Sequence, residues 1–594
     1  MKLKHIYMIG AFALVVTSCN EDSFLSLKPQ GSLNEDIMTS TKGADLLVNA
    51  AYAALGGPEG QSWSVWCHPT TNWTYGEVRS DNAYKGGGGV GDLNEVHRME
   101  TFDMDATNGF LDSKWYHLYC SVQRCNSALR VLNAATDEQV KGRTSRIAEM
   151  KVLRAHYYFE LSRLFNKIPY FDENVEISQY PDIANNEFTR DEILGKLAKE
   201  MLDAAEQLPS TQSEVGRIHK YVALAYAAKI KLYQAYQQDE STHAVTAINK
   251  DLLKEVVSLC DQVTASNRYD LLNDFQGLDL VANENGKESV FAVQYSMNDG
   301  TESAGRINWS NLLNSPGGGS PYGGDGFFLP SQDLINAYQT DANGLPDFNY
   351  QSKVDYSRTV LSNGVYTLEN TTPSVDPRLD FVVGRPNITW KTYSEKPCDG
   401  WVRDKETYGY NCAKRFWVSP ESSDMFKGWP WGASQLNWQI IRYVDILLWK
   451  AEALIEINEG NGLDTARDLI NQIRNRAKNS AYVKDFKNGS KYAANYLINP
   501  YTATGWNQEY ARKALRSETR LEKALEGERF FDLVRWGIAE TTMNNYIGAE
   551  KDNRIYYAKA HFTSGKDEFY PIPNNQYGFS GGKYVQNPGY ADFK

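Results

Sequence analysis

Apolar residues recur at helical spacing through long stretches of this chain. Across residues 147–165 they follow a period of about 3.6 residues and leave little polar face, which predicts a mostly buried helix. Residues 222–236 are rich in alanine, whose small side chain suits close contact between helices. Residues 444–455 and 466–477 form two further stripes, and the glycines between them permit a tight reversal. The pattern predicts antiparallel helix pairs of the tetratricopeptide type.

Two long segments interrupt this helical pattern. Residues 56–110 and about 285–434 are rich in glycine and aromatic residues, and together they hold nine of the 14 tryptophans. Loops of this length inside a compact chain usually have a function or are disordered. Disordered segments are poor in aromatic residues, so we predict that these segments form a binding surface. The alternative is a loop layer that packs a small core of its own.

These segments together predict a mainly α fold. We expect a scaffold of tetratricopeptide-like helix pairs, few short strands and a large, irregular, loop-rich ligand-binding region. Residues 41–284 form the helical scaffold, including the aromatic loop 56–110, and residues 285–434 form the variable loop-rich region. Residues 435–594 contain C-terminal helical repeats and a proline-containing tail, which is expected to lie extended across the helical body.

The first residues have the pattern of a secretion signal. Lys2 and Lys4 precede a short apolar run, and small residues lead from it to Cys19. The run is too short to cross a bilayer as a helix, which takes about 20 apolar residues. Residues 1–18 therefore resemble a signal peptide, and residues 19–40 a lead-in. The alternative is an ordinary secretory peptide in which Cys19 occurs by chance.

The residues around Cys19 resemble two signals of bacterial lipoproteins. Val16-Thr17-Ser18-Cys19 is similar to a lipoprotein cleavage box. The acidic stretch Asn20-Glu21-Asp22 resembles the tag that sends lipoproteins of Bacteroidetes-type bacteria to the cell surface. These resemblances imply a protein exposed on the outer membrane and anchored by lipid on Cys19.

The charge balance argues against several kinds of partner. The chain has 62 Lys and Arg against 74 Asp and Glu, a net charge of −12, and loss of residues 1–18 would make it −14. Nucleic acid binding needs clustered Lys and Arg, so no nucleic acid partner is expected. A basic face lying on a membrane is disfavoured for the same reason. Neutral ligands remain compatible with this composition.

Six cysteines remain apart from Cys19, too few in a chain of this length for disulfides to define the fold. Cys398 and Cys412 could pair across a loop, and the sequence leaves this open. Cys120 and Cys125 lie on a predicted helix and are expected to pack as small apolar residues. The sequence has no CxxC pair and no zinc spacing.

The sequence lacks the common catalytic and cofactor motifs. Gly86, Gly88 and Gly91 match GxGxxG, but no apolar strand precedes them. A stretch that starts at Asp103 resembles a calcium loop, yet Lys114 occupies the position of its bidentate Glu. We predict that the protein uses no cofactor and is not an enzyme. The sequence leaves open whether a structural calcium ion binds elsewhere in the chain. Glycosidase carboxylates come from distant segments, so their spacing cannot reveal them.

Several blocks of the sequence resemble the SusD/RagB family, the surface glycan-binding lipoproteins of Bacteroidetes. The block from Arg442 to Ala453 is similar to the family helix R-x-x-D-I-L-L-x-x-A-E-A. The other matching blocks are residues 466–477, the most recognisable block 526–537, the ending 570–573 with 586–590, and upstream 24–29 and 153–159. The resemblance runs from end to end but is weak in residues 285–434.

The charged residues of these blocks are expected to be structural. In block 526–537, acidic and basic residues are spaced three apart from Glu526 to Arg535, which predicts ion pairs across the turns of one helix. Arg442 and Asp445 are expected to form a packing-and-cap pair rather than a site.

The resemblance implies capture of a ligand without chemistry on it. Members of this family resemble a lid over a TonB-dependent transporter of the SusC type, to which they pass oligosaccharide. The expected partners are therefore an oligosaccharide or polysaccharide, a SusC-like transporter, and the outer membrane through Cys19. Two alternatives are a surface glycoside hydrolase that uses two acidic loop residues, and a protein-binding helical scaffold without a sugar site.

A sugar site needs flat aromatic rings beside amide, carboxylate or guanidinium groups. Residues 73–82 supply both, as does the stretch that starts at residues 308–311. The candidate ligand-binding residues are Trp73, Tyr75, Arg79, Asp81, Asn82, Trp309 and Tyr322. Residues 429–431, with two tryptophans, are a third candidate. For each ring the alternative is burial beneath its own loop.

Overall fold

The computed structural model describes residues 40–57, 66–300, 305–391 and 397–593. The predicted signal peptide, Cys19 and the acidic stretch that follows it lie outside these residues. Within the described residues, helices dominate and the strands are short, so the predicted mainly α fold is confirmed.

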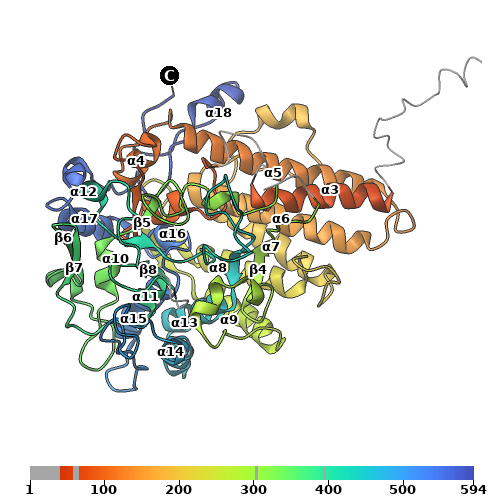
Figure 1. The fold of residues 1–594 in the computed structure, drawn as a ribbon. Coiled ribbons are helices and arrows are strands. Elements are labelled where there is room, and N and C mark those ends of the chain that lie inside the picture. Colours follow the sequence, from red (N-terminus) through yellow and green to blue (C-terminus); the bar gives the residue numbers. More distant parts are fainter. Residues whose placement is uncertain (1–39, 58–65, 301–304, 392–396, 594) are drawn as a thin grey trace, which may run out of the picture.

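The N-terminal half is a stack of helices in which neighbours along the chain pack against one another (Figure 1). Its helices are α3 (Thr41–Ala53), α4 (Asn94–Glu100), α5 (Gly109–Ala134), α6 (Arg143–Phe165), α7 (Arg190–Gln207), α8 (Lys220–Ala235) and α9 (Lys250–Ala265). The predicted burial of residues 147–165 is confirmed in α6, because from Ala148 to Phe165 only Lys151 is not buried. Helix α7 starts at a capping box, in which the Thr189 hydroxyl and the Glu192 carboxylate each accept the other's backbone N–H.

The C-terminal half adds α13 (Tyr443–Ile457), α14 (Gly462–Asn479), α15 (Gln508–Glu522), α16 (Arg529–Arg535), α17 (Ala539–Glu550) and α18 (Asn574–Phe579). Helix α13 packs against α9 as well as against α14 and α15, and so connects the two halves. The predicted cap is confirmed: the Arg442 backbone N–H donates to the Asp445 carboxylate at 2.7 Å.

The predicted ion pairs in block 526–537 are only partly confirmed. Asp532 and Arg535 do pair across one turn of α16, at 2.9 Å. The prediction that Glu526 shares this helix is wrong, because α16 begins at Arg529. Arg529 pairs instead with Asp81, from a segment far away in the sequence.

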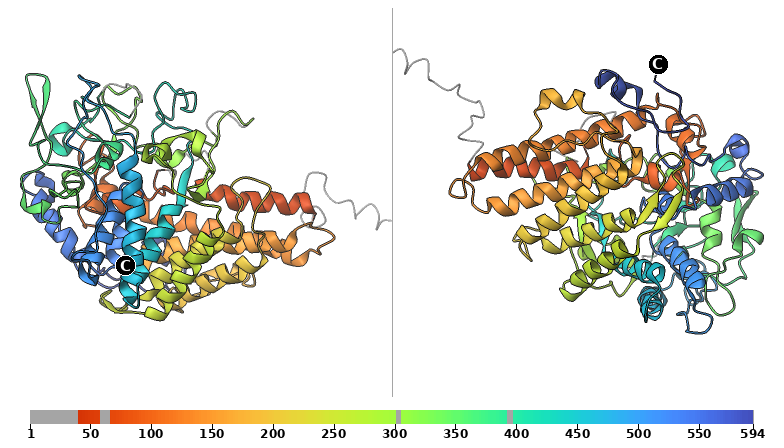
Figure 2. Two further views of the ribbon diagram at one scale, coloured as in Figure 1. Left: turned by 90° about the horizontal axis from the view of Figure 1, so that it is seen from below. Right: turned by 180° about the vertical axis from the view of Figure 1, so that it is seen from behind.

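The loop-rich region contains short elements rather than a continuous sheet. Its helices are α10 (Gln332–Ala337), α11 (Arg378–Val382) and α12 (Lys405–Tyr408). The strands of the described residues form antiparallel pairs: β1 (Ala83–Gly86) with β5 (Phe327–Pro330), β2 (Tyr236–Gln238) with β3 (Val245–Ile248), β4 (Ser289–Val293) with β10 (Trp438–Arg442), β6 (Arg358–Ser362) with β7 (Val365–Glu369), and β8 (Val383–Gly384) with β9 (Cys412–Ala413). Figure 2 shows the irregular segments gathered on one side of the helical body.

The loop-rich region is joined to the helices by a buried group of ion pairs, which we call the inner ion cluster. It includes Glu288, Arg378, Arg442, Arg474, Arg476, Glu518, Glu522 and Glu526. Arg378 lies on α11, whereas Glu518 and Glu522 lie on α15. All eight residues are buried, so the cluster holds the loops in place from beneath.

A second core is shared between the loop-rich region and residues 530–569, so the alternative of a core formed by the loops alone is only partly met. Tyr322, Trp390, Trp401 and Trp417 are buried there, and their rings pack at centroid distances of 4.9 to 6.1 Å. Among the described residues, no helix is both long enough and apolar enough to cross a membrane.

Candidate ligand-binding face

The structure places the first group of candidate residues inside the protein. The side chains concerned are those of Trp73, Tyr75, Arg79, Asp81 and Asn82, and each residue is at most 1 % exposed. Two of them lie on a π-helical turn, η2 (Trp73–Val78), and the others follow it directly. In this arrangement none of the five offers a ring or a polar group to a ligand at the surface.

These residues are buried because their segment docks against block 526–537. The Glu77 carboxylate accepts the backbone N–H of Gly527 at 2.8 Å, and Arg529 donates two hydrogen bonds to Asp81, at 2.8 and 2.9 Å. A Cβ atom on Gly76 would lie only 1.8 Å from the Gly527 carbonyl oxygen, so the close approach requires glycine. Burial raises the pKa of Glu77 to about 7.

Arg79 and Tyr322 are also held by contacts within the protein. The Arg79 guanidinium lies 4.2 Å from the ring centroid of Tyr570 and 4.9 Å from that of Phe530, contacts of the cation–π type. The Tyr322 hydroxyl donates to the Val418 carbonyl at 2.8 Å and accepts the indole N–H of Trp390 at 3.0 Å. The sequence could not show this, because the same residue types serve cores and sugar sites.

Trp309 has a different environment from the other candidates. It starts the 3-10 turn η6 (Trp309–Asn311), is half-buried, and packs against Trp429 with ring centroids 5.4 Å apart at 64°. Trp429 is 58 % exposed and Trp431 is 46 % exposed. Apolar side chains exposed singly are normal, but exposed rings that gather in one place mark interaction sites. We call Trp309, Trp429 and Trp431 the tryptophan face.

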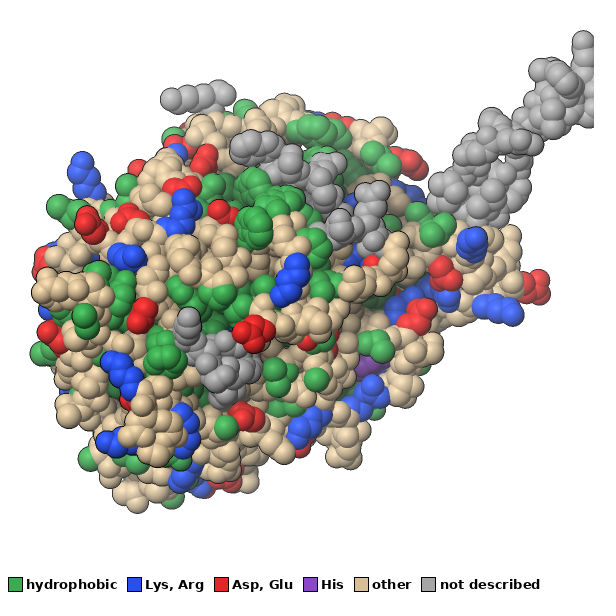
Figure 3. Space-filling model, in the orientation of Figure 1, with side chains coloured by type: hydrophobic (Ala, Val, Ile, Leu, Met, Phe, Trp, Pro, Cys, Tyr) green, Lys and Arg blue, Asp and Glu red, His purple; other side chains and the backbone are tan. Residues whose placement is uncertain are grey.

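Backbone hydrogen bonds bring these distant residues together. The Asn308 N–H donates to the Ser434 carbonyl at 3.0 Å, and the Phe426 N–H donates to the Ala433 carbonyl at 2.9 Å. The second bond closes the turn that carries Trp429 and Trp431. Figure 3 shows hydrophobic side chains gathered on the side of the molecule that carries the loop-rich region.

Polar groups without partners flank Trp309 in the sequence. The side-chain atoms Asn308 Oδ1, Asn311 Nδ2, Asn314 Oδ1 and Ser315 Oγ are buried and have no hydrogen-bond partner among the described residues. Ser315 lies against Gly432, the neighbour of Trp431. Buried polar groups are normally satisfied by protein, water or ligand. These four residues are at most 4 % exposed, so only water or a ligand that reaches beneath the rings would bond to them.

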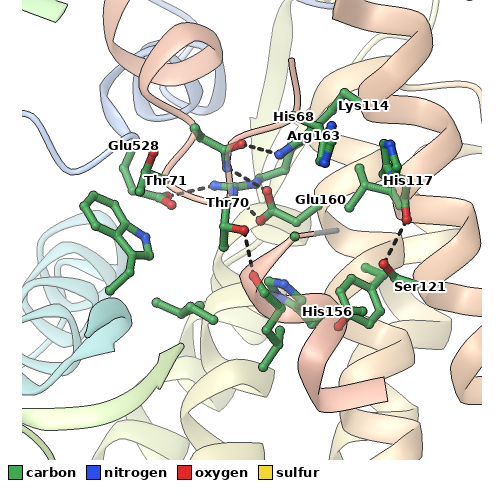
Figure 4. A pocket seen from close by; sticks show the side chains of 18 of the residues that line it. His68, Thr70, Thr71, Lys114, His117, Ser121, His156, Glu160, Arg163 and Glu528 are labelled. Carbon is green, nitrogen blue, oxygen red and sulfur yellow. Dashed lines mark hydrogen bonds and ion pairs between the residues drawn. The ribbon is translucent and has the colours of Figure 1, made fainter. Parts of the chain in front are cut away.

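A separate polar cavity lies within the helical body (Figure 4). Its volume is about 70 Å³, and its lining includes Lys114, Glu160, Arg163 and Glu528. Arg163 donates to Glu528 at 2.7 Å, and Lys114 donates to the Asn72 side-chain oxygen at 2.9 Å. Ligand pockets have volumes of about 300 Å³ or more, so this cavity has room for a few water molecules but not for a sugar.

Burial also depresses the basicity of the groups around this cavity. Desolvation lowers the pKa of His156 to about 4 and that of Lys114 to about 8. The described residues contain no group of three His, Cys, Asp or Glu side chains placed to hold a metal ion.

Comparison with known proteins agrees with the helical scaffold and its loops. The family model described as "SusD family" matches residues 287–590, which is more than half of the chain. A second model, described as "Starch-binding associating with outer membrane", matches residues 23–232. The chain belongs to the SusD family. The resemblance of the sequence blocks is thereby confirmed, and the first match includes residues 287–434, where those blocks are sparse.

Relatives within the SusD family span nearly the whole chain. SusD-like protein P2 from Formosa agariphila is 24 % identical and covers 98 % of this chain and 99 % of its own length. A SusD superfamily protein from Bacteroides vulgatus has the same fold, with a TM-score of 0.66 at 20 % identity over 93 % of this chain and 99 % of its own. Surface glycan-binding protein A from Bacteroides thetaiotaomicron, in complex with laminarihexaose, gives a TM-score of 0.61 at 18 % identity over 92 % of this chain and 99 % of its own.

Proposed function

We propose that this SusD-family protein captures oligosaccharide at the tryptophan face and delivers it to a SusC-like TonB-dependent outer-membrane transporter. The observation that supports this is the combination of exposed indole rings with unpartnered amide groups buried beside them. Sugars present apolar C–H faces that stack on such rings, and hydroxyls that bond to amides. A relative of the same fold is described in complex with laminarihexaose, which makes laminarin oligosaccharides the first ligands to test.

The binding test compares three substitutions on the intact chain. Calorimetry or affinity gels with a glycan panel should show binding by the wild type and a loss of about tenfold or more for Trp309→Ala and Trp429→Ala. The matched control is Phe579→Ala, because Phe579 is 77 % exposed on α18, outside the loop-rich region, and it should leave affinity unchanged. Failure to bind any glycan in a broad panel would contradict the ligand proposal.

The location and the transporter need separate tests. We propose that lipid on Cys19 keeps the protein at the outer membrane with its body exposed outside the cell. Replacing Cys19 with Ala should abolish retention in the membrane fraction and leave sugar binding intact. The wild type should copurify with a TonB-dependent transporter. Copurification together with an empty glycan panel would favour the protein-binding scaffold instead.

We further propose that the bound glycan is not cleaved. The hydrolase alternative has one observation in its favour: desolvation, followed by the charge of Asp424, raises the pKa of Glu284 to about 7. A carboxyl group that stays protonated near neutral pH is what a glycosidase uses as its general acid. The release of reducing ends by the wild type, lost in Glu284→Gln, would establish the hydrolase and overturn the binding-only proposal.

A further inference from the structure

Cys398 and Cys412 come together in the loop-rich region. Both are buried, in the same core as Trp390 and Trp401. In the strand pair β8–β9, Cys412 lies directly opposite Gly384. A Cβ atom on Gly384 would lie 3.4 Å from the Cys398 sulfur, so this sulfur sits beside the strand residue that faces Cys412. The neighbouring Cys398 also raises the pKa of the Cys412 thiol.

The other described cysteines are placed differently. Cys125 lies on α5 and Cys260 on α9, and both are buried within the helical body. Cys398 and Cys412 are free cysteines in the structure as well, but they are neighbours across Gly384. A disulfide requires its two Cα atoms to be about 4.4–6.8 Å apart with the side chains directed toward each other. The position of the Cys398 sulfur beside the strand residue that faces Cys412 suits this geometry.

We propose that Cys398 and Cys412 are joined by a disulfide in the mature protein. The proposal rests on the cell-surface location proposed above, because disulfides persist outside the cytoplasm and thiols are kept reduced inside it. The sulfur–sulfur bond forms by exchange with a disulfide oxidant. The two thiols give up two protons and two electrons, and the oxidant is reduced to its dithiol. Because both sulfurs are buried in the folded protein, the exchange takes place while the chain folds.

The disulfide would close a loop beneath the tryptophan face. The segment from Cys398 to Cys412 carries Trp401, whose ring lies 4.9 Å from that of Trp390 and 6.1 Å from that of Tyr322. Tyr322 in turn lies against Gly432, because a Cβ atom on that glycine would be 3.6 Å from the Tyr322 Cβ. The bond therefore fixes the aromatic layer on which the exposed tryptophans are supported.

The decisive experiment maps the thiols in protein recovered from the outer membrane. The full chain is denatured in the presence of an alkylating agent, with or without prior reduction, and its peptides are identified by mass spectrometry. We expect Cys398 and Cys412 to be alkylated only after reduction and to appear otherwise as one linked peptide. Cys125 and Cys260 are the internal controls and should be alkylated in both samples. Alkylation of Cys398 and Cys412 without reduction would overturn the proposal.

A second arm keeps the test independent of the proposed location. The chain lacking residues 1–18 is refolded with oxidised glutathione as the oxidant. Formation of the Cys398–Cys412 bond would support the proposed pairing, whereas free thiols or glutathione adducts at these positions would overturn it. The melting temperature gives a further readout. A reductant should lower the melting temperature of the oxidised wild type by a few degrees, to the melting temperature of the double variant C398S/C412S. It should not change the melting temperature of the double variant. Glycan binding measured on the same samples reports separately on the proposed function.

Discussion

The inner ion cluster and the tryptophan face both have buried polar groups, but those groups are satisfied in the first region and not in the second. In the cluster, Arg442 is buried and donates to Glu288, Glu522 and Glu526 at distances of 2.7 to 3.2 Å. Beside the face, buried amide atoms such as Asn311 Nδ2 have no partner among the described residues. The comparison teaches that unmet hydrogen-bonding capacity beside exposed rings, rather than composition, separates the proposed binding surface from the protein interior.

The largest effect should come from breaking the inner ion cluster. Arg442→Met leaves three buried carboxylates without this shared partner, and we expect it to lower the free energy of unfolding by about 3–5 kcal/mol. The control is Arg467→Ala, because Arg467 pairs with Asp464, which is largely exposed on α14, and such pairs contribute at most about 1 kcal/mol. Urea denaturation followed by circular dichroism measures both. Equal effects would show that the cluster is not a special source of stability.

The next effect concerns the docking of residues 73–82. Gly76→Ala places a methyl group where the Gly527 carbonyl lies, and we expect a loss of about 2 kcal/mol or more because backbone must move. Gly548→Ala is the matched control: it is exposed on α17 and its new Cβ meets nothing within 4 Å. In a helix interior this control should stabilise by about 0.5–1 kcal/mol. A tolerated Gly76→Ala would argue that the segment is more loosely held than its contacts indicate.

The third effect should separate binding from stability at the tryptophan face. Asn314→Ala removes an amide whose oxygen has no described partner and whose nitrogen donates one long bond, of 3.4 Å, to Asn311 Oδ1. The melting temperature should therefore change little. If the amide bonds a sugar hydroxyl, affinity should fall by up to about tenfold, the value of one hydrogen bond. Calorimetry and thermal melts on the same protein provide both readouts. A loss of stability without a loss of affinity would assign Asn314 to the protein interior instead.

Much of the scaffold could be predicted because helical periodicity is local. The apolar stripe of residues 147–165 lies within α6, and the stripes of residues 444–455 and 466–477 lie within α13 and α14. The site was harder to predict. Trp73 and Trp309 look alike in sequence, but Trp73 is buried because its segment docks on Gly527, about 450 residues away. Such contacts depend on tertiary structure, and no spacing rule reveals them.

The smallest effect is a difference in pH dependence between the two regions. Within the inner ion cluster, burial alone would raise the pKa of Glu526, but Arg442, Lys523 and Arg415 outweigh it and lower this pKa from 4.5 to about 2. A pKa that is lower in the folded protein means that the stabilisation is present above pH 4.5 and is lost as the pH falls through about 2.

Indole and amide groups do not titrate in this range, so glycan affinity should stay constant from pH 8 down to the onset of acid unfolding. Acid titrations of stability and of affinity, run on the wild type and on Glu526→Gln, would test this. The variant should lose part of the acid dependence of stability and keep the affinity profile, and an affinity that titrates above pH 5 would place a carboxylate at the tryptophan face.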